Sequence, residues 1–362
     1  MSEKNSQTEL KFMDHTLPID ERVEDLISQL TLEEKISQVF NMSSAIERLN
    51  FPAYDWRNEC IHGVAFAGIA TVFPQNIGMA ATWNTKLIFQ TAQAISTEAR
   101  AKYNHSVKND TKNRGKRYYG LTFAAPNINI LRDPRWGRGQ ETFGEDPYLT
   151  SQMGVNFVRG LQGDDPNYYR IISEVKHFAV HSGPEKERHQ INIIASKKDM
   201  EETYLPAFKA CVQKGKAFGI MGAYNRLNGV PCCAHRELLQ EILRDQFGFK
   251  GYVIGDGGAV DDIYLHHKVV DTFEEAGSMA LKAGLNVINP LNIMTKWKIK
   301  KYYKSLFKAV QKGLLSEFTI NRALRLTFEA VFKLGVFDPP ELVPYSKISY
   351  DVVDCEEHRE LA

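Results

Sequence analysis

The chain is poor in cysteine, with five in 362 residues, and none of them form a CxxC pair. Cys232 and Cys233 are adjacent instead, so their spacing suggests neither a disulfide framework nor a zinc site, although distant residues can still meet in space. An excess of one charge is also lacking, because the formal net charge is +1. Without a basic field to hold a polyphosphate, nucleic acid is not an expected partner.

Long apolar runs are missing as well. The sequence has no window of about 18 apolar residues, so we expect no membrane-spanning helix and no membrane partner. Residues Met1 to Leu10 are polar and mixed in charge, unlike a secretory signal. We therefore expect a cytoplasmic protein, or a periplasmic or secreted one if a signal has been removed.

Nucleotide-binding glycine patterns are absent too. Gly137 and Gly139 resemble the start of a dinucleotide fingerprint, but Thr142 stands where the third glycine should be. The chain contains no P-loop either. These absences leave no signal for a nucleotide cofactor.

Short apolar runs alternate with longer amphipathic stretches along most of the chain. Helix is expected over residues 20–42, where Thr31 and Glu34 form a capping box. The expected strands are Leu121–Ile130, Ile171–Val175, Phe218–Ala223, Tyr252–Ile254 and Asn286–Ile288. The other expected helices are Thr85–Tyr103, Pro147–Leu161, Lys198–Gln213, Arg236–Phe247, Thr272–Ala283, Tyr302–Lys312 and Glu317–Leu334. Residues 104–117 form a polar, basic insertion, which predicts a surface loop.

This alternation of strand and helix predicts βαβ units and a mainly parallel sheet. Several such units over roughly 250–300 residues fit a barrel better than an open Rossmann sheet. We therefore predict an α/β fold of the (β/α)8 TIM-like type, in which some strands can be irregular or missing.

Polar residues follow three consecutive predicted strands. Lys176 and His177 follow the first, Tyr224 to Arg226 follow the second, and Asp256 follows the third. Catalytic groups of barrel enzymes come from the C-terminal ends of several strands. Packing alone does not readily explain three strands that end in this way.

Asp256 ends an apolar strand and is followed by Gly257 and Gly258. Glycines at this point let a ligand approach the backbone closely. A turn aspartate or a helix N-cap is an equally good interpretation of Asp256 taken alone. Lys176 and His177 can donate hydrogen bonds to hydroxyls, but an isolated pair of this kind is more often a structural strand end.

The segment Leu131–Leu149 is dense in arginines and carboxylates. Such a knot commonly stiffens a loop, although one arginine directed into a pocket could bind a hydroxyl or keep a carboxylate ionised. The segment reads LRDPRWGRGQETFGEDPYL, which resembles the signature of glycoside hydrolase family 3. Further segments resemble the family in its own order: DWRNECIHGVA, TVFPQNIGMAATWN, KHFAVHSGPEKERH, MGAYNRLNGVPCC and GFKGYVIGDGGA. The subgroup resembled is bacterial β-glucosidase/β-xylosidase.

The resemblance implies a retaining, exo-acting β-glycosidase that needs neither a metal nor an organic cofactor. The family's nucleophile falls on Asp256, which would carry the covalent glycosyl intermediate. The sugar-binding Lys-His pair falls on Lys176 and His177, and the tyrosine beside the nucleophile on Tyr224. The acid that grips a distal hydroxyl falls on Glu59.

The hydroxyl-binding arginine of the family falls on Arg138, with Arg132 as the second choice. Arg188, in the loop after the Lys-His pair, is a further substrate-binding candidate. The expected partner is a β-linked oligosaccharide or an aryl glycoside, and a homodimer is a candidate assembly.

The sequence departs from the family pattern near the nucleophile and near its end. Gly255 and Gly257 stand where the family has a serine and, close after the nucleophile, a bulky residue that is often tryptophan. The stretch Leu285–Lys301 also matches poorly. Residues 1–335 therefore read as the family's N-terminal barrel, and residues 336–362 as a linker toward an absent α/β-sandwich domain, which usually supplies the acid/base carboxylate.

Two alternatives remain open at this stage. The chain could be a single-domain β-N-acetylglucosaminidase, in which a loop histidine, His181 or His189, acts as the acid/base. It could also be a non-catalytic barrel that binds carbohydrate, because glycines flank Asp256 and the stretch Leu285–Lys301 fits poorly.

Overall fold

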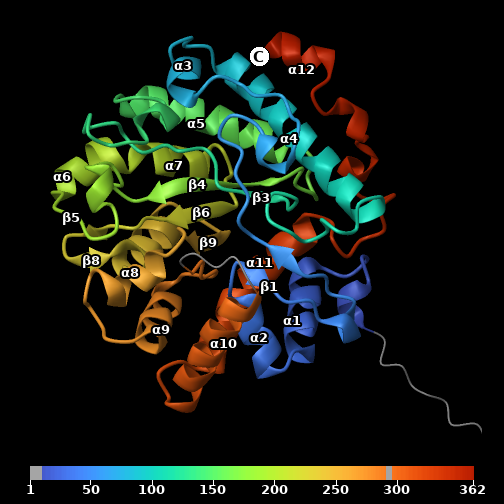
Figure 1. Cartoon of the computed structure of the whole chain (residues 1–362), viewed down its shortest axis with the longest axis vertical. Coiled ribbons are helices and arrows are strands. Elements are labelled where there is room, and N and C mark those ends of the chain that lie inside the picture. Colours follow the sequence, from blue (N-terminus) through green and yellow to red (C-terminus); the bar gives the residue numbers. More distant parts are fainter. Residues whose placement is uncertain (1–9, 291–295) are drawn as a thin grey trace, which may run out of the picture.

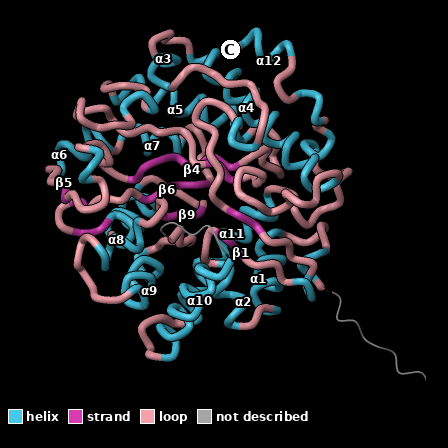
Figure 2. The backbone as a smooth tube through the Cα atoms, in the orientation of Figure 1, coloured by secondary structure: helices cyan, strands magenta, loops and turns pink. Residues whose placement is uncertain are grey.

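The computed structural model describes residues 10–290 and 296–362. A parallel four-stranded sheet lies at its centre (Figures 1 and 2). Its strands, in spatial order, are β3 (Thr122–Phe123), β4 (Ile172–Phe178), β6 (Gly219–Gly222) and β9 (Tyr252–Gly255). Every residue of these strands is buried, because helices cover the sheet as they do in α/β folds.

Short strand segments continue the sheet on both edges. Val287 bridges to Ile254 of β9, and the neighbouring Ile288 bridges to Phe40, both in parallel. Phe40 leads into β1 (Met42–Ser43), which pairs antiparallel with β2 (Tyr54–Asp55). Asn58, just after β2, bridges in parallel to Phe123 of β3. These described segments form a closed hydrogen-bonded ring, which confirms the TIM-like barrel, with its irregularity at the antiparallel β1–β2 pair.

Helices surround the ring (Figure 1). They are α1 (Ile19–Gln29), α2 (Leu32–Gln38), α3 (Asn76–Ala80), α4 (Thr85–Lys108), α5 (Pro147–Gln162), α6 (Lys197–Asp199), α7 (Pro206–Gln213), α8 (Ala259–Leu265), α9 (Phe273–Ala283), α10 (Lys296–Gln311), α11 (Glu317–Lys333) and α12 (Glu356–Leu361). Two further segments, Met200–Tyr204 and Glu237–Gln246, are π-helical. A small sheet of β5 (Asn192–Ile193), β7 (Arg226–Leu227) and β8 (Val230–Pro231) lies to one side.

Several predicted boundaries were wrong for identifiable reasons. The strand expected at Leu121–Ile130 is interrupted: β3 covers only Thr122–Phe123. Pro126 has no N–H to donate to the ladder, and pairing with β4 resumes after it, where Asn127 bridges in parallel to Lys176. Lys176 and His177 do not follow β4 but belong to it. The expected helix 20–42 is two helices, and α2 starts at the predicted capping box of Thr31 and Glu34.

The insertion 104–117 is only partly a loop, since α4 extends to Lys108. The expected helix Lys198–Gln213 is interrupted by a π-helical turn, and a new helix starts at Pro206. In the poorly matching stretch Leu285–Lys301, the chain passes through the sheet bridges at 287–288, residues 291–295 lie outside the described part, and α10 begins at Lys296.

The C-terminal segment packs against the barrel rather than standing away from it (Figure 1). Arg22 of α1 forms a buried ion pair with Asp338 at 2.6 Å. Farther along, the carboxylate of Glu98 in α4 accepts hydrogen bonds from the backbone N–H of Asp354 and from the His358 ring, at 3.0 and 2.8 Å. Thr71 donates two more, from its N–H and its hydroxyl. Glu98 therefore joins α4, the segment before α3 and the C-terminal segment.

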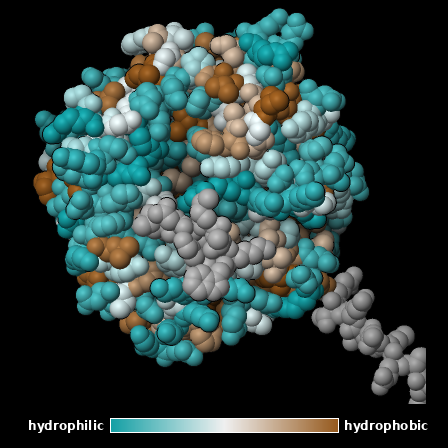
Figure 3. All heavy atoms as spheres, in the orientation of Figure 1, coloured by the Kyte–Doolittle hydropathy of each residue, from teal (hydrophilic) through white to brown (hydrophobic). Residues whose placement is uncertain are grey.

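None of the helices in the described part of the chain is long and apolar enough to cross a membrane. The face in Figure 3 is mainly hydrophilic, with hydrophobic side chains scattered over it. That pattern is ordinary for a surface in contact with water.

Replacing Glu98 should loosen the C-terminal segment. Burial opposes ionisation of Glu98, but hydrogen bonds from His358, Thr71 and Asp354 outweigh it and lower the pKa of the carboxyl. A lowered folded-state pKa contributes stability that is present above the ordinary pKa of glutamate and is lost as pH falls. We expect Glu98→Gln to lower the free energy of unfolding by about 3 kcal/mol at pH 7, and by less as pH falls below about 4.5.

Urea denaturation across this pH range measures the effect, and limited proteolysis reports whether residues 354–361 detach first. Glu34→Gln is the control, because Glu34 also has a lowered pKa, set chiefly by its bonds to Arg48, but far from the C-terminal segment. A Glu98→Gln protein with parental stability at pH 7 would contradict the anchoring role.

Candidate active site

Asp256 lies directly after β9, with its side chain 14% exposed. Its Oδ1 accepts a hydrogen bond from the N–H of Gly257 at 2.7 Å. Its Oδ2 is buried and has no hydrogen-bond partner among the described residues. One oxygen is thus anchored to the backbone, while the other is left unpaired beside the strand ends.

His177 of β4 approaches this unpaired oxygen, with its Nε2 3.4 Å from Asp256 Oδ2. The imidazole is fully enclosed, and burial, followed by the charge of Arg138, holds the pKa of His177 well below its usual value. The ring is therefore neutral, and the short approach is not an ion pair.

The neighbours of His177 fix which ring nitrogen carries the proton. Nδ1 lies 2.9 Å from the side-chain oxygen of Asn129, which also accepts the backbone N–H of His177. A guanidinium can only donate, and Arg138 Nη1 lies 3.0 Å from Nε2. The proton is therefore assigned to Nδ1, and Nε2 accepts from Arg138.

Arg138 is itself paired through two hydrogen bonds with Glu141, at 2.8 and 2.7 Å. Burial works against its charge, but Glu141 and then Asp256 outweigh that cost and raise the pKa of Arg138. Conversely, the bonds from Arg138 and the nearby Lys176 lower the pKa of Glu141 despite its burial. Lys176 and Arg138 thus bring fixed positive charge to the Asp256 end of the barrel. Arg132 instead donates to the carbonyl of Val180 and lies over Tyr204.

Tyr224 follows β6, and its hydroxyl oxygen lies 3.8 Å from the point where a side chain on Gly257, next to Asp256, would begin. Its side chain is buried, and burial together with the Asp256 carboxylate holds the pKa of its hydroxyl well above the usual value. The guanidinium of Arg188 lies 5.2 Å from the centre of the Tyr224 ring. Of the predicted residues, His177, Arg138 and Tyr224 therefore lie around Asp256. Arg188 borders Tyr224, and Lys176 precedes His177 in β4.

Glu59 is placed differently from the other predicted residues. It is half-buried after β2, and its Oε1 accepts the N–H of Ile61 at 2.5 Å. No hydrogen bond or ion pair between described residues connects it to Asp256. Its neighbour Arg57 reaches Gly257, the residue after Asp256: Nη1 of Arg57 lies 3.3 Å from the point where a side chain on Gly257 would begin.

Arg57 also contacts Asn289, to whose oxygen its Nη1 donates at 3.3 Å. The side-chain nitrogen of Asn289 is buried without a partner in the described part of the chain. Arg57, Asn289 and the Tyr224 hydroxyl therefore surround the face of Gly257 where a bulky residue was expected. Polar groups thus occupy the space where the family resemblance predicts a bulky side chain.

Asn129, Arg57 and Asn289 were missed by the sequence analysis. Asn129 and Asn289 each stand at the end of a predicted strand, the same signal that identified Asp256. That signal was applied to three strands only and not to these two. Arg57 lies in the DWRNECIHGVA segment, but that segment does not indicate a contact with Gly257, which only the folded chain shows.

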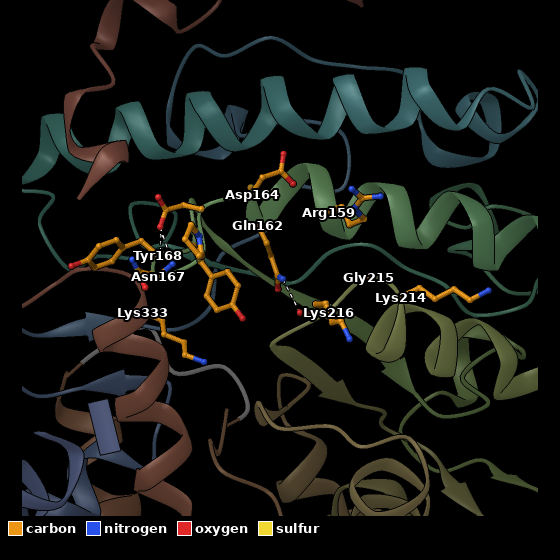
Figure 4. Close-up of a pocket in the computed structure, with 13 residues that line it drawn as sticks. Arg159, Gln162, Asp164, Asn167, Tyr168, Lys214, Gly215, Lys216 and Lys333 are labelled. Atoms are coloured by element: carbon orange, nitrogen blue, oxygen red, sulfur yellow. Dashed lines mark hydrogen bonds between the residues drawn. The ribbon is translucent and has the colours of Figure 1, made fainter. Parts of the chain in front are cut away.

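A cavity of about 260 Å³ lies elsewhere, lined by Arg159, Gln162, Lys216 and their neighbours (Figure 4). These residues come from the end of α5 and the segments that precede β4 and β6. They mark the N-terminal ends of the strands, whereas catalytic groups in barrels come from the C-terminal ends. The cavity is therefore not part of the candidate site.

One group of described residues brings possible metal ligands together, namely His189, Asp262 and His266. It lies behind Tyr224 and does not include Asp256. The groups around Asp256 are instead the Arg138 guanidinium, the His177 imidazole and the Tyr224 hydroxyl, a set that can stabilise a negative charge and bind hydroxyls.

Comparison with known proteins agrees with this geometry. The sequence profile described as the glycosyl hydrolase family 3 N-terminal domain matches residues 20–328. The chain is 45% identical over 349 residues to a xylan 1,4-β-xylosidase of Xylanibacter ruminicola, covering 96% of this chain and 40% of that protein. It is 41% identical to a probable β-D-xylosidase of Arabidopsis thaliana, covering 99% of this chain and 47% of that one.

Solved structures show the same fold. A family 3 exo-β-xylosidase in complex with a xylobiose aziridine probe superposes with a TM-score of 0.85 at 31% identity, covering 97% of this chain and 45% of that one. A β-glucosidase from Listeria innocua in complex with isofagomine gives a TM-score of 0.77 at 26% identity, covering 94% of this chain and 50% of that one. The chain thus spans less than half the length of the curated relatives it matches.

The two glycines that face each other on β6 and β9 provide a matched test of the site's packing. Gly222 pairs with Gly255. A Cβ on Gly255 would lie 3.6 Å from Cys233 Sγ, an ordinary contact, whereas a Cβ on Gly222 would lie only 2.8 Å from it. We expect Gly255→Ser to change the free energy of unfolding by less than about 0.5 kcal/mol, and Gly222→Ala to cost about 1–3 kcal/mol.

Urea denaturation of the two variants measures the difference. A large loss in Gly255→Ser would show that the residue before the nucleophile must be glycine here. Equal effects in the two variants would contradict the packing described around Cys233.

Proposed function

The chain belongs to glycosyl hydrolase family 3, and we propose that it is the nucleophile-bearing barrel of a retaining, exo-acting β-glycosidase. The proposed substrates are β-linked xylo- or gluco-oligosaccharides and aryl β-glycosides. The observation that carries the proposal is that Oδ2 of Asp256 is buried and unpaired, with Arg138 and Tyr224 close enough to interact with its charge. The names of the relatives support the choice of sugars.

In the proposed first step, Asp256 Oδ2 attacks the anomeric carbon. A carbon–oxygen bond forms to the carboxylate while the bond to the leaving oxygen breaks, and the leaving oxygen takes the bonding electron pair and a proton from the general acid. Water then attacks the glycosyl ester in a second displacement and gives its proton back to that group, which frees Asp256 and restores the β configuration. Oδ1 stays fixed by the Gly257 N–H throughout.

The surrounding residues have separate tasks in this proposal. Arg138 and Lys176 favour the ionised carboxylate and offer hydrogen bonds to sugar hydroxyls. His177 presents an Nε2 that accepts from Arg138, so it orients the guanidinium and has no proton there to donate to Asp256. Tyr224 keeps its proton, because its pKa is raised, and can donate it toward Asp256.

The groups near Asp256 are poor proton donors to a leaving group. Glu141 is ionised in its pair with Arg138. His181 is buried, and burial lowers its pKa to about 3, so at neutral pH it is not the imidazolium that could protonate a leaving group. We propose that the general acid belongs to another part of the full-length protein.

The single-domain alternative needs a loop histidine with a free acidic N–H. His181 is neutral, and the Nε2 of His189 faces the N–H of Arg188 at 3.2 Å. Neither arrangement favours a proton donor directed at a glycosidic oxygen. The carbohydrate-binding alternative differs from the enzyme in one measurable respect, covalent labelling of Asp256.

Asp256→Asn should preserve the fold and abolish most turnover. An amide is a far weaker nucleophile than a carboxylate, so we expect the rate on an activated aryl β-glycoside to fall by several orders of magnitude. Thermal unfolding checks the fold, and Asp245→Asn, an exposed site on the π-helical segment, is the matched control. Turnover by Asp256→Asn within tenfold of the parent would exclude Asp256 as the nucleophile.

The chain should form the intermediate more readily than it completes the reaction. An activated 2-deoxy-2-fluoro aryl β-xyloside or β-glucoside carries a leaving group that departs without a proton, so we expect slow labelling of Asp256. Release of the sugar should be slower still, and xylobiose and cellobiose should be nearly untouched.

Intact mass spectrometry follows the adduct, and peptide mapping locates it. Efficient cleavage of xylobiose by the chain alone would overturn the assignment of the acid to another part of the protein and would make His189 the first residue to replace. No adduct under conditions where the sugar binds would favour the carbohydrate-binding alternative.

A further inference from the structure

A buried carboxylate connects two histidines behind Tyr224. Asp262 of α8 has a fully buried side chain, and each of its oxygens meets one imidazole. Oδ2 lies 2.8 Å from Nδ1 of His189, in the loop after β4, and Oδ1 lies 2.7 Å from Nδ1 of His266, one helical turn along. A carboxylate removed from water is stable only with such donors.

The carboxylate determines where the proton of His189 sits. An ionised carboxylate only accepts hydrogen bonds, so Nδ1 of His189 must carry the proton and Nε2 is left with a lone pair. Arg188 Nε lies 3.2 Å from that Nε2, and a guanidinium only donates. Asp262 as the acceptor at Nδ1 and Arg188 as the donor at Nε2 therefore both favour the His189 tautomer that is protonated on Nδ1.

His189 and Arg188 both lie against Tyr224, the neighbour of Asp256. The ring of His189 packs against that of Tyr224 with centroids 4.6 Å apart. Arg188 lies over the same tyrosine and donates to Glu185 at 2.6 Å. Tyr224 in turn borders Asp256, whose charge raises the pKa of its hydroxyl.

We propose that Asp262 is a positioning residue that holds His189 as its Nδ1–H tautomer, so that Nε2 anchors Arg188 over Tyr224 at the edge of the sugar site. The inference rests on the proposed function, because it gives Arg188 a part in substrate binding. Asp262 acts only through His189 and Arg188 and touches no substrate itself.

A metal ion is the competing use of these three side chains, whose ligand atoms lie within 4.8 Å of one another. A metal on Nδ1 of His189 would move the ring proton to Nε2. That proton would then face the N–H of Arg188, and two donors cannot bond to each other. The hydrogen bonds from Asp262 through His189 to Arg188 and an occupied metal site therefore exclude one another.

The tautomer of His189 can be read directly by ¹⁵N NMR of the histidine rings, with the signal assigned by its loss in His189→Gln. We expect a protonated Nδ1 and a bare Nε2 in the parent chain. A protonated Nε2 there would overturn the proposal without reference to any variant. So would saturable binding of Zn²⁺ that moves the same ring signals.

Two substitutions of Asp262 separate positioning from packing. Asp262→Leu removes both acceptors, so we expect the His189 proton to move to Nε2 and KM for an activated aryl β-xyloside to rise about tenfold, with kcat changed less. Asp262→Asn keeps one carbonyl oxygen for His189, while its amide can turn to the partly exposed His266. It should retain the Nδ1–H tautomer and a KM within threefold of the parent.

Glu98→Gln is the matched control, because it breaks another buried carboxylate–histidine contact, that with His358, and should alter neither KM nor the His189 tautomer. Equal KM values for Asp262→Leu and the parent would contradict the positioning role. The tautomer is measured without turnover, so a failure of this inference is distinguishable from a failure of Asp256 to be labelled.

Discussion

The candidate site depends on one costly feature, a carboxylate oxygen of Asp256 that is buried without a hydrogen-bond partner among the described residues. An unpaired buried charge is tolerated only where opposite charge lies near it. Arg138 and Lys176 supply that charge at the ends of the barrel strands. The proposed role of Asp256 as a nucleophile gains from this arrangement, because no hydrogen bond to Oδ2 has to be broken before it attacks.

Burial also disfavours the charge of Arg138, and a second set of groups stabilises it. Glu141 pairs with Arg138 through two bonds, while Asn129 keeps the proton of His177 on Nδ1 and leaves Nε2 for Arg138. Next to Tyr224, Asp262 and Arg188 contact the two ring nitrogens of His189 in the same way. In both places an oxygen lies against one imidazole nitrogen and an arginine donates to the other.

The sheet decides which of these groups can meet. Parallel strands bring their C-terminal ends to one edge, so β4, β6 and β9 deliver His177, Tyr224 and Asp256 together. The ring closes through short bridges rather than long strands, and one of them places Asn289 beside Arg57. Those two residues and the Tyr224 hydroxyl occupy the side of Gly257 where the family resemblance predicted a large side chain.

The sequence by itself determined the fold class, because alternating strands and helices are a local signal, and its ordered motifs determined the family. Strand-end polar residues are local signals too, and they made Asp256 and Tyr224 candidates for the site. The capping box at Thr31 was equally local and was confirmed. Some predicted boundaries were wrong. The strand expected over Leu121–Ile130, for example, is interrupted around Pro126.

Only the tertiary structure decided the partners of these residues. It joined Asn129 to His177, Asp262 to His189, and Arg57 to Asn289, pairs separated by tens to hundreds of residues in the chain. In the folded chain Arg138 lies near Asp256, whereas Arg132, from the same motif, donates to Val180. Hydrogen-bond direction, tautomer and charge balance depend on which groups meet in space, and no periodicity in the sequence records that.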